Sequence, residues 1–211
     1  GVMFGAESVE HEISIISAIQ VMDALDKTRY DVVPIYISKD KHLYSGDVLT
    51  NLSAYKDIPK LLKAATEVSL VRVHQQLQCK PIKNTLFFKQ KNIDLVIPVV
   101  HGSNSEDGTI AGYCQMLGVP YVGSDVIAAA IGQDKIFFKH VLENSRLPIV
   151  PWFWFYGKHF ERSKQVIFEK AKELGYPVIV KPATLGSSIG IMIANDPKTL
   201  EFAIETAMVY D

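Results

Sequence analysis

The feature that most constrains the fold is an alternation of apolar strands and amphipathic helices in the first half of the chain. The apolar run GVMFG precedes VEHEISIISAIQVMDAL, whose apolar residues recur at helical spacing (Ile15, Ala18, Ile19, Met22 and Leu25). YDVVPIYIS and NIDLVIPVV (92–100) are typical of buried strands, SEDGTIAGYCQMLG predicts a capped helix, and VPYVGS predicts a short strand. Because alternating strands and helices connect by right-handed crossovers, we expect an α/β, Rossmann-like domain with a mainly parallel sheet.

A second domain is predicted after Gly123. DVIAAAIG, DKIFFKHVLENS and KHFERSKQVIFEKAKELG predict helices, and WFWFYG is strongly β-prone. YPVIVK predicts a buried strand and IGIMIA a second one, with a glycine-containing loop between them, and a helix follows from Pro197. We therefore expect a substrate-binding domain at residues 1–123 and a small α+β domain at residues 124–211, whereas residues 45–91 carry no clear pattern.

The composition excludes several classes of protein. A formal net charge of −1 argues against charge-driven binding to nucleic acid or to an anionic membrane. The two cysteines have no metal-ligand or CxxC spacing, which favours a reducing compartment. Since we find neither an apolar run of the roughly 20 residues that span a bilayer nor a signal-peptide pattern, we expect a cytoplasmic protein without nucleic-acid or membrane partners.

The loop KPATLGSSIGI (181–191) is a candidate phosphate site. Lys181 places a cation at the end of a strand, Gly186 and Gly190 permit tight backbone turns, and Ser187 and Ser188 add hydrogen-bond donors. These groups suit the phosphates of a nucleotide, although the lysine precedes the glycines and so does not form a Walker A loop. An exposed hairpin with a solvated lysine is an equally open interpretation.

Two further segments carry candidate groups at the ends of predicted strands. In HGSNSEDGT, His101 lies past the carboxyl end of a strand, where open α/β sheets bind ligands, and Asp107 is better explained as a helix cap than as a reactive group. In GAESVEHEIS, Glu10 lies at the start of a helix, where a carboxylate can bind an ammonium group. It can equally contribute about 0.3–1 kcal/mol through the helix dipole alone.

Taken together, four ordered segments resemble the D-alanine–D-alanine ligase family of the ATP-grasp superfamily. They are FGAESVEHEISIISA, PVVHGSNSEDGTIAGYCQMLGVPYVGSD, QDK (133–135) and PVIVKPATLGSSIGI. The first resembles the N-terminal glycine turn and acidic helix start of that family, and the second resembles its His-Gly…Glu-Asp-Gly segment. The last two resemble the lysine-bearing segments of its ATP-binding central domain.

The resemblance implies a role for particular residues. The catalytic residues would be Glu10 and Ser187, joined by a hydrogen-bonded link that couples loop closure to substrate occupancy. Glu10 would hold the ammonium of the first D-alanine, with Ile13 beside its methyl group and His101 near its carboxylate. The residues that contact ATP would be Lys135, Lys181, Ser187 and Ser188.

The implied activity is ATP-dependent joining of two D-alanines through an acyl phosphate, which supplies a precursor of peptidoglycan. Such phosphoryl transfer requires electrostatic clamping by lysines, backbone N–H groups and Mg²⁺. The resemblance also implies a homodimer. The sequence stops at AMVYD, just before the family's hinge strand, so we expect the C-terminal ATP-grasp domain and its Mg²⁺ ligands to be absent from this chain. We therefore expect no ligation by the 211 residues alone.

The sequence departs from the family pattern at Asn104, Ser105, Ala111 and Gln133. These departures concern substrate detail more than nucleotide binding. A D-alanine–D-lactate or D-alanine–D-serine ligase, and a non-catalytic module that binds nucleotide or D-amino acid, remain open alternatives. A dinucleotide-dependent enzyme is disfavoured because neither the glycine spacing nor a later acidic residue fits that fingerprint.

Overall fold

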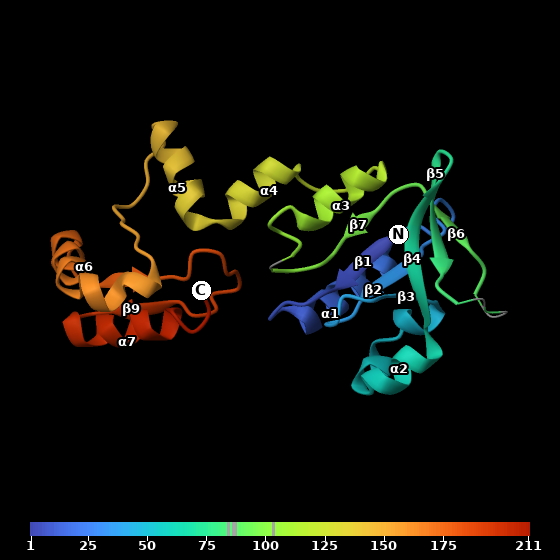
Figure 1. The fold of residues 1–211 in the computed structure, drawn as a ribbon, viewed down its shortest axis with the longest axis horizontal. Helices are drawn as coiled ribbons and strands as arrows, with labels where there is room; N and C mark the ends of the chain where they lie inside the picture. The colour runs from blue at the N-terminus through green and yellow to red at the C-terminus, as the bar shows by residue number, and fades with distance from the viewer. Residues whose placement is uncertain (84, 86–87, 103) are drawn as a thin grey trace. The chain divides into compact units, whose positions relative to one another are not determined.

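The computed structural model describes residues 1–83, 85, 88–102 and 104–211. Its internal contacts divide the chain into two compact units, Gly1–Ala130 and Ile131–Asp211. The division falls within helix α4 (Val126–Gln133), shortly after the boundary that the sequence predicts at Gly123. Figure 1 shows the N-terminal unit from blue to yellow-green and the C-terminal unit from yellow to red.

The N-terminal unit is built on a seven-stranded sheet with the strand order β6-β5-β4-β3-β2-β1-β7. Its strands are β1 (Val2–Gly5), β2 (Pro34–Ile37), β3 (Leu43–Ser45), β4 (Thr66–Val73), β5 (Gln76–Pro81), β6 (Lys91–Ile93) and β7 (Ile97–Pro98). Its helices are α1 (His11–Ala24), α2 (Ile58–Ala64) and α3 (Thr109–Leu117), with two 3₁₀ turns, η1 (Asp47–Thr50) and η2 (Leu52–Lys56). The α/β class expected from the sequence is confirmed.

The parallel part of the sheet is smaller than the sequence suggests. Among the described strands, the parallel pairs are those of β1 with β2 on one side and with β7 on the other. Strands β3 to β6 pair antiparallel with their neighbours, and β4 and β5 come from the region in which the sequence carries no clear pattern. The predicted strand at 92–100 is divided into β6 and β7, and VPYVGS contributes one parallel bridge, between Val96 and Tyr121, instead of a strand.

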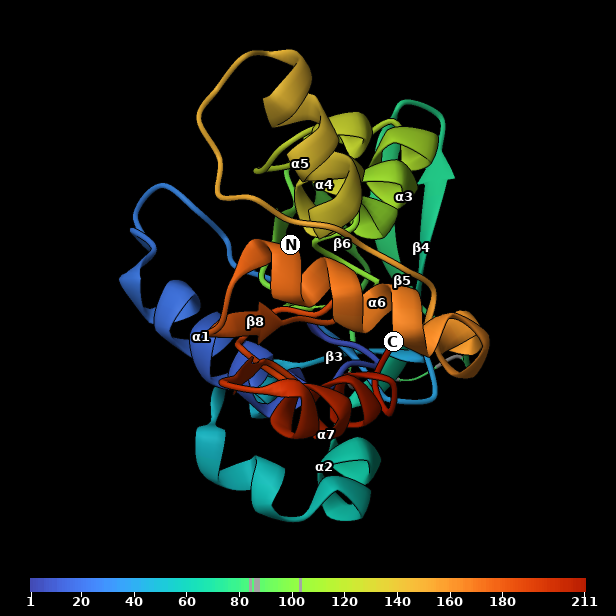
Figure 2. The same ribbon diagram turned by 90° about the vertical axis from the view of Figure 1, so that its left-hand side faces the viewer.

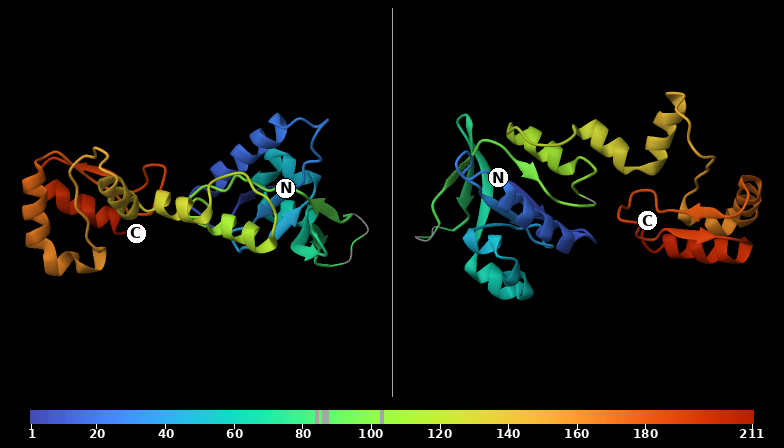
Figure 3. Two further views of the ribbon diagram at one scale, coloured as in Figure 1. Left: turned by 90° about the horizontal axis from the view of Figure 1, so that it is seen from above. Right: turned by 180° about the vertical axis from the view of Figure 1, so that it is seen from behind.

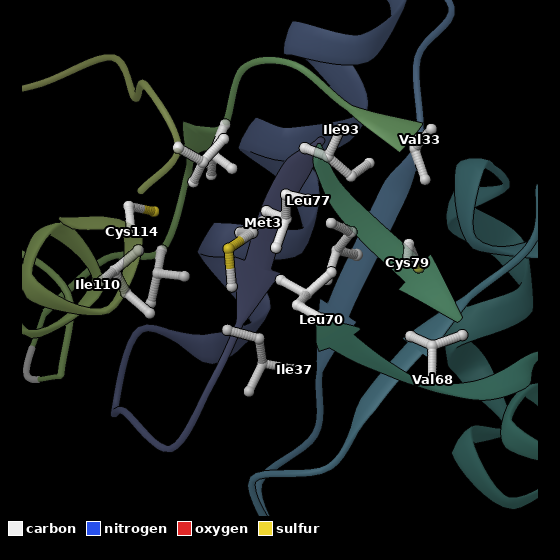
Figure 4. Close-up of a cluster of buried hydrophobic side chains, with 14 of the residues drawn as sticks. Met3, Val33, Ile37, Val68, Leu70, Leu77, Cys79, Ile93, Ile110 and Cys114 are labelled. Atoms are coloured by element: carbon white, nitrogen blue, oxygen red, sulfur yellow. The ribbon is translucent and has the colours of Figure 1, made fainter. Parts of the chain in front are cut away.

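Hydrophobic clusters cover both faces of this sheet. Since successive strand residues point to opposite faces, Val2 and Phe4 pack with α1, while Met3 packs with α3. Figure 4 shows the cluster around Met3, in which Ile110 and Cys114 of α3 face the side chains of the sheet. Burial on both faces is typical of a sheet that βαβ crossovers cover with helices on both sides.

The side chain of Ser14 connects three elements of the unit. It lies on α1 and is fully buried. Its hydroxyl oxygen accepts the Gly5 backbone N–H at 2.8 Å and donates to the Val99 carbonyl at 2.7 Å. Helix α1 is thereby tied both to the end of β1 and to the segment that follows β7.

The C-terminal unit is a hairpin covered by helices. Its elements are α5 (Lys135–Asn144), η3 (Gly157–His159), α6 (Phe160–Leu174), β8 (Val178–Val180), β9 (Met192–Ala194) and α7 (Pro197–Ala207). Strands β8 and β9 pair antiparallel, and their inward residues form one core with α6 and α7 (Figure 2). The predicted helices and the two strands on either side of the glycine-containing loop are thus confirmed.

Two expectations for this unit need correction. The run WFWFYG forms no strand, because its aromatic rings pack on each other and on α6: Phe153 stacks on Phe155, and Phe155 stacks on Phe160. Strand β8 is buried on one face only, since Ile179 and its cross-strand partner Ile193 are both exposed.

In the part of the chain that the structure describes, the helices are too short or too polar to cross a membrane.

We expect Ser14→Ala to lower the free energy of unfolding by roughly 2–4 kcal/mol, because it leaves a buried N–H and a buried carbonyl without partners. Chemical denaturation of the N-terminal unit, followed by circular dichroism, measures this loss. Ser124→Ala, at an exposed serine of the same unit, is the control. Equal stability of the two variants would contradict the role given to Ser14.

Candidate functional site

The turn after β1 is held in a left-handed conformation. Gly5 has a φ of 93° and Ala6 a φ of 69°, a region that a residue with a side chain seldom adopts. The buried ring of His11 stabilises this turn, since its Nδ1 lies 2.6 Å from the Ala6 carbonyl and its Nε2 lies 3.0 Å from the Tyr36 hydroxyl. A carbonyl can only accept, so Nδ1 donates and, in the neutral ring, Nε2 accepts from Tyr36.

Glu10 and the turn that follows His101 lie side by side in the N-terminal unit. Glu10 is only 8% exposed, and its backbone N–H donates to Ser8 Oγ at 3.0 Å. The Ser8 hydroxyl in turn donates to the His101 carbonyl at 2.8 Å. A Cβ atom at Gly102 would lie 2.8 Å from Glu10 Oε2, so the glycine is what allows the carboxylate to lie there.

The His101 ring is oriented by α1 and by Glu106. Its Nε2 lies 3.0 Å from Ser17 Oγ, and its Nδ1 lies 3.8 Å from Glu106 Oε1. Glu106 also accepts the Gly102 backbone N–H at 3.1 Å, which closes the turn over the carboxyl end of β7. The backbones of two predicted substrate residues, Glu10 and His101, are therefore connected through the Ser8 hydroxyl.

The remaining predicted groups of this unit have simpler surroundings. Ile13 is 54% exposed on α1, one turn from Glu10. Asp107 accepts the backbone N–H groups of Thr109 and Asn104 at 2.9 and 2.8 Å, which agrees with the structural role predicted for it. The N-cap residue itself is Gly108. Ser103, within the same predicted segment, lies outside the described residues.

In the C-terminal unit, Lys135 lies against the loop between β8 and β9. It begins α5, whose N-cap Asp134 accepts two backbone N–H groups. The Lys135 ammonium donates to the carbonyls of Ala183, at 3.3 Å, and Leu185, and its backbone N–H donates to the Ala183 carbonyl at 3.0 Å. Lys135 thus lies against residues 183–185 of the loop that Lys181 begins.

The second half of that loop consists of two overlapping turns. Backbone hydrogen bonds run from Ile189 N to Gly186 O and from Ile191 N to Ser188 O. Ser187 and Ser188 are both exposed and have φ values of 48° and 60°. Such non-glycine residues cost about 1–3 kcal/mol each and are concentrated at ligand clamps.

Lys181 acts electrostatically on two other lysines of this unit. Burial lowers the pKa of the Lys135 ammonium below its usual range, and the positive charge of Lys181 lowers it further. Burial and Lys181 lower the pKa of Lys139 in the same way. Lys139, one helical turn after Lys135, was not predicted from the sequence, although its spacing places it on the same face of α5. Ammonium groups gathered in this way attract a polyanion such as a nucleotide phosphate chain.

Two family models match most of this chain. The model described as "D-ala D-ala ligase N-terminus" matches residues 1–124, and the model described as "D-ala D-ala ligase C-terminus" matches residues 141–211. The chain belongs to the D-alanine–D-alanine ligase family. The two matched regions contain the turn with Glu10 and the loop with Lys181.

Individual members of the D-alanine–D-alanine ligase family show the same similarity. Proteins named D-alanine–D-alanine ligase from Thermosipho melanesiensis and Chloroherpeton thalassium are 38% and 39% identical to this chain over 100% and 99% of its length. The chain spans only 56% and 58% of those two relatives.

Solved structures of the family agree with the fold. The D-alanine–D-alanine ligase from Helicobacter pylori matches 99% of this chain and 60% of its own, with 27% identity and a TM-score of 0.80. The VanG D-Ala:D-Ser ligase from Enterococcus faecalis matches 100% of this chain and 59% of its own, with 26% identity and a TM-score of 0.78.

The lowered pKa of Lys135 predicts how stability depends on pH. The unfolded chain, with a lysine pKa of about 10.4, holds this proton to higher pH than the folded chain does. Stability therefore rises with pH as the pH passes the lowered pKa of Lys135, and it levels off above the unfolded value. We expect the stability of the wild type relative to Lys135→Met to rise with pH as the pH approaches about 10.4, as measured by urea denaturation. A difference that is constant or falls with pH would contradict the burial of this ammonium.

Proposed function

We propose that this chain forms the D-alanine-binding and ATP-binding parts of an ATP-dependent D-alanine–D-alanine ligase. The observation that carries the proposal is the loop between β8 and β9, where Lys135 lies on the loop carbonyls and Lys181 affects its pKa. Membership of the ligase family supports the same proposal. The loop KPATLGSSIGI does connect the two strands of a hairpin. Its contact with Lys135 favours the phosphate site over a hairpin with no ligand.

The N-terminal unit provides the site for the first D-alanine. The Glu10 carboxylate is the group that holds the substrate ammonium, since an ion pair at a largely buried carboxylate is stronger than one at the surface. Ile13 lies one turn further along α1 and contacts the methyl group. His101, oriented by Ser17 and Glu106, faces the substrate carboxylate.

The C-terminal unit holds the phosphates of ATP. Lys135 and Lys181 supply positive charge to the transferring phosphoryl group, and Ser187 and Ser188 supply hydroxyl and backbone donors from the left-handed turn. The Lys135 ammonium has three donors, so with two of them on the loop carbonyls the third is available for a phosphate oxygen. The link between Ser187 and Glu10 joins residues of different units and stays a prediction.

The chemistry proceeds in two steps. A carboxylate oxygen of the first D-alanine attacks the γ-phosphorus of ATP, the bond to the β-phosphate oxygen breaks, and ADP leaves. The amine of the second D-alanine then attacks the acyl carbon, loses a proton and displaces inorganic phosphate. Both steps need the charge on the phosphoryl oxygens to be stabilised in a site from which water is excluded.

Mg²⁺ is a further requirement of such phosphoryl transfer, because it neutralises charge on the phosphates. Within residues 1–83, 85, 88–102 and 104–211, no three His, Cys, Asp or Glu side chains are grouped as metal ligands, so we assign no residue of this chain to the metal. A cytoplasmic homodimer is the form that we propose for the whole protein.

The second substrate is open between D-alanine and D-serine. The similarity to the D-Ala:D-Ser ligase from Enterococcus faecalis, with a TM-score of 0.78, is nearly as high as that to the ligase from Helicobacter pylori, at 0.80. Offering the native protein D-alanine together with D-serine or D-lactate, and identifying the products by mass spectrometry, decides between these activities.

Two substitutions separate the two binding roles. We expect Lys181→Ala to weaken ATP binding by roughly tenfold to a hundredfold, the loss of one charge-assisted hydrogen bond, and to leave D-alanine binding nearly unchanged. We expect Glu10→Ala to do the reverse. Isothermal titration of the native protein with adenylyl imidodiphosphate and with D-alanine measures both constants.

Each variant has a matched control. Lys198→Ala removes an exposed lysine of α7, and Glu12→Ala removes the exposed carboxylate that pairs with Lys39. Both controls should bind both ligands like the wild type. Unchanged ATP affinity in Lys181→Ala would refute the phosphate role of the loop, and weakened ATP binding in Glu10→Ala would refute the ammonium role.

A further inference from the structure

The end of the chain contacts both halves of the loop between β8 and β9. One carboxylate oxygen of Asp211, Oδ2, accepts the Thr184 backbone N–H at 2.7 Å and the Thr184 hydroxyl at 3.0 Å. On the other half, a Cβ atom at Gly190 would lie 3.0 Å from the ring of Tyr210. In Figures 1 and 3 the C label lies beside this loop, as these contacts require.

The same short segment also accepts hydrogen bonds from the end of α4 and the start of α5. The Thr184 carbonyl accepts Gln133 Nε2 at 2.6 Å, and the carbonyls of Ala183 and Leu185 accept the Lys135 ammonium. The first half of the loop is therefore held by hydrogen bonds from two separate parts of the chain.

This arrangement makes the position of Lys135 depend on Asp211. The Lys135 ammonium is directed by two carbonyls, and the residue between those carbonyls, Thr184, is fixed by the Asp211 carboxylate. The negative charge of Asp211 also raises the pKa of Lys135, which opposes the effects of burial and of Lys181. Asp211 thus acts on the lysine both through the loop and through its charge.

We propose that Asp211 is a positioning residue for nucleotide binding, which anchors residues 183–185 through Thr184 and so directs Lys135 towards the phosphate chain. The proposal rests on the ATP-binding function proposed above. It predicts that Asp211 affects triphosphates more than AMP, because AMP does not present the β- and γ-phosphates to Lys135.

The test compares three variants of the chain. Asp211→Ala removes both hydrogen bonds and the charge. Asp211→Asn places one amide oxygen where both bonds are accepted, and so removes mainly the charge. Asp196→Ala is a matched control, because Asp196 Oδ1 accepts the N–H and hydroxyl of Thr199 at 2.8 and 3.0 Å in the same manner, at the start of α7.

Two readouts apply to each variant. Hydrogen exchange at the Thr184 amide, measured by NMR without nucleotide, reports the anchor itself. The ratio of affinities for adenylyl imidodiphosphate and for AMP, measured by titration, reports its effect on phosphate binding. We expect Asp211→Ala to speed exchange at Thr184 and to lower the affinity ratio about tenfold, equivalent to one hydrogen bond to a charged group.

Asp211→Asn should retain slow exchange at the Thr184 amide and recover part of the affinity ratio. Asp196→Ala should change neither the exchange at Thr184 nor the affinity ratio. Thr184→Ser should match the wild type, and Thr184→Val should show an intermediate loss, which keeps the test valid if Asp211→Ala folds poorly. Unchanged exchange in Asp211→Ala, or an equal fall of the ratio in Asp196→Ala, would overturn the positioning role. Failure of the wild type to bind either nucleotide would instead overturn the proposed function, and the positioning role with it.

Discussion

The N-terminal site depends on the buried hydroxyl of Ser14, which joins α1 to the ends of two parallel strands. The Ser14 hydroxyl bonds to the Gly5 N–H and to the Val99 carbonyl. These bonds hold the start of α1 against the turn after β1 and against the segment that carries His101. The Ser8 hydroxyl repeats the connection nearer the surface, between Glu10 and His101. The backbones of Glu10 and His101, from distant parts of the sequence, are thereby held together.

The C-terminal unit is organised by charge instead. Lys135, Lys139 and Lys181 share one region, and burial and mutual repulsion lower the pKa of the first two. In the function proposed above, a bound polyanion would offset this repulsion, so a cost in stability would be converted into affinity. The left-handed serines of the loop are consistent with the same principle, since strained backbone is tolerated where a ligand is held.

The sequence predicted those features that arise from local patterns. Helices α1, α3, α5, α6 and α7 followed from apolar spacing and caps, and the loop at 181–191 followed from its glycines and serines. The antiparallel strands β3, β4 and β5 were not predicted, because strands with mixed burial lack a clear alternation. Ser8, Ser14 and Asp211 were missed for a different reason: each acts through a partner many residues away, and no local pattern marks such a contact.

The most direct test of the proposed function measures whether an oxygen atom passes from D-alanine to phosphate. If the native protein joins D-alanines through an acyl phosphate, the bond between the carboxylate oxygen of the first D-alanine and phosphorus is kept when phosphate leaves. Turnover of D-alanine labelled with ¹⁸O in its carboxylate should therefore place one ¹⁸O atom in each inorganic phosphate released, as mass spectrometry can detect. Phosphate released in step with the dipeptide but without the label would contradict the proposed function of the chain.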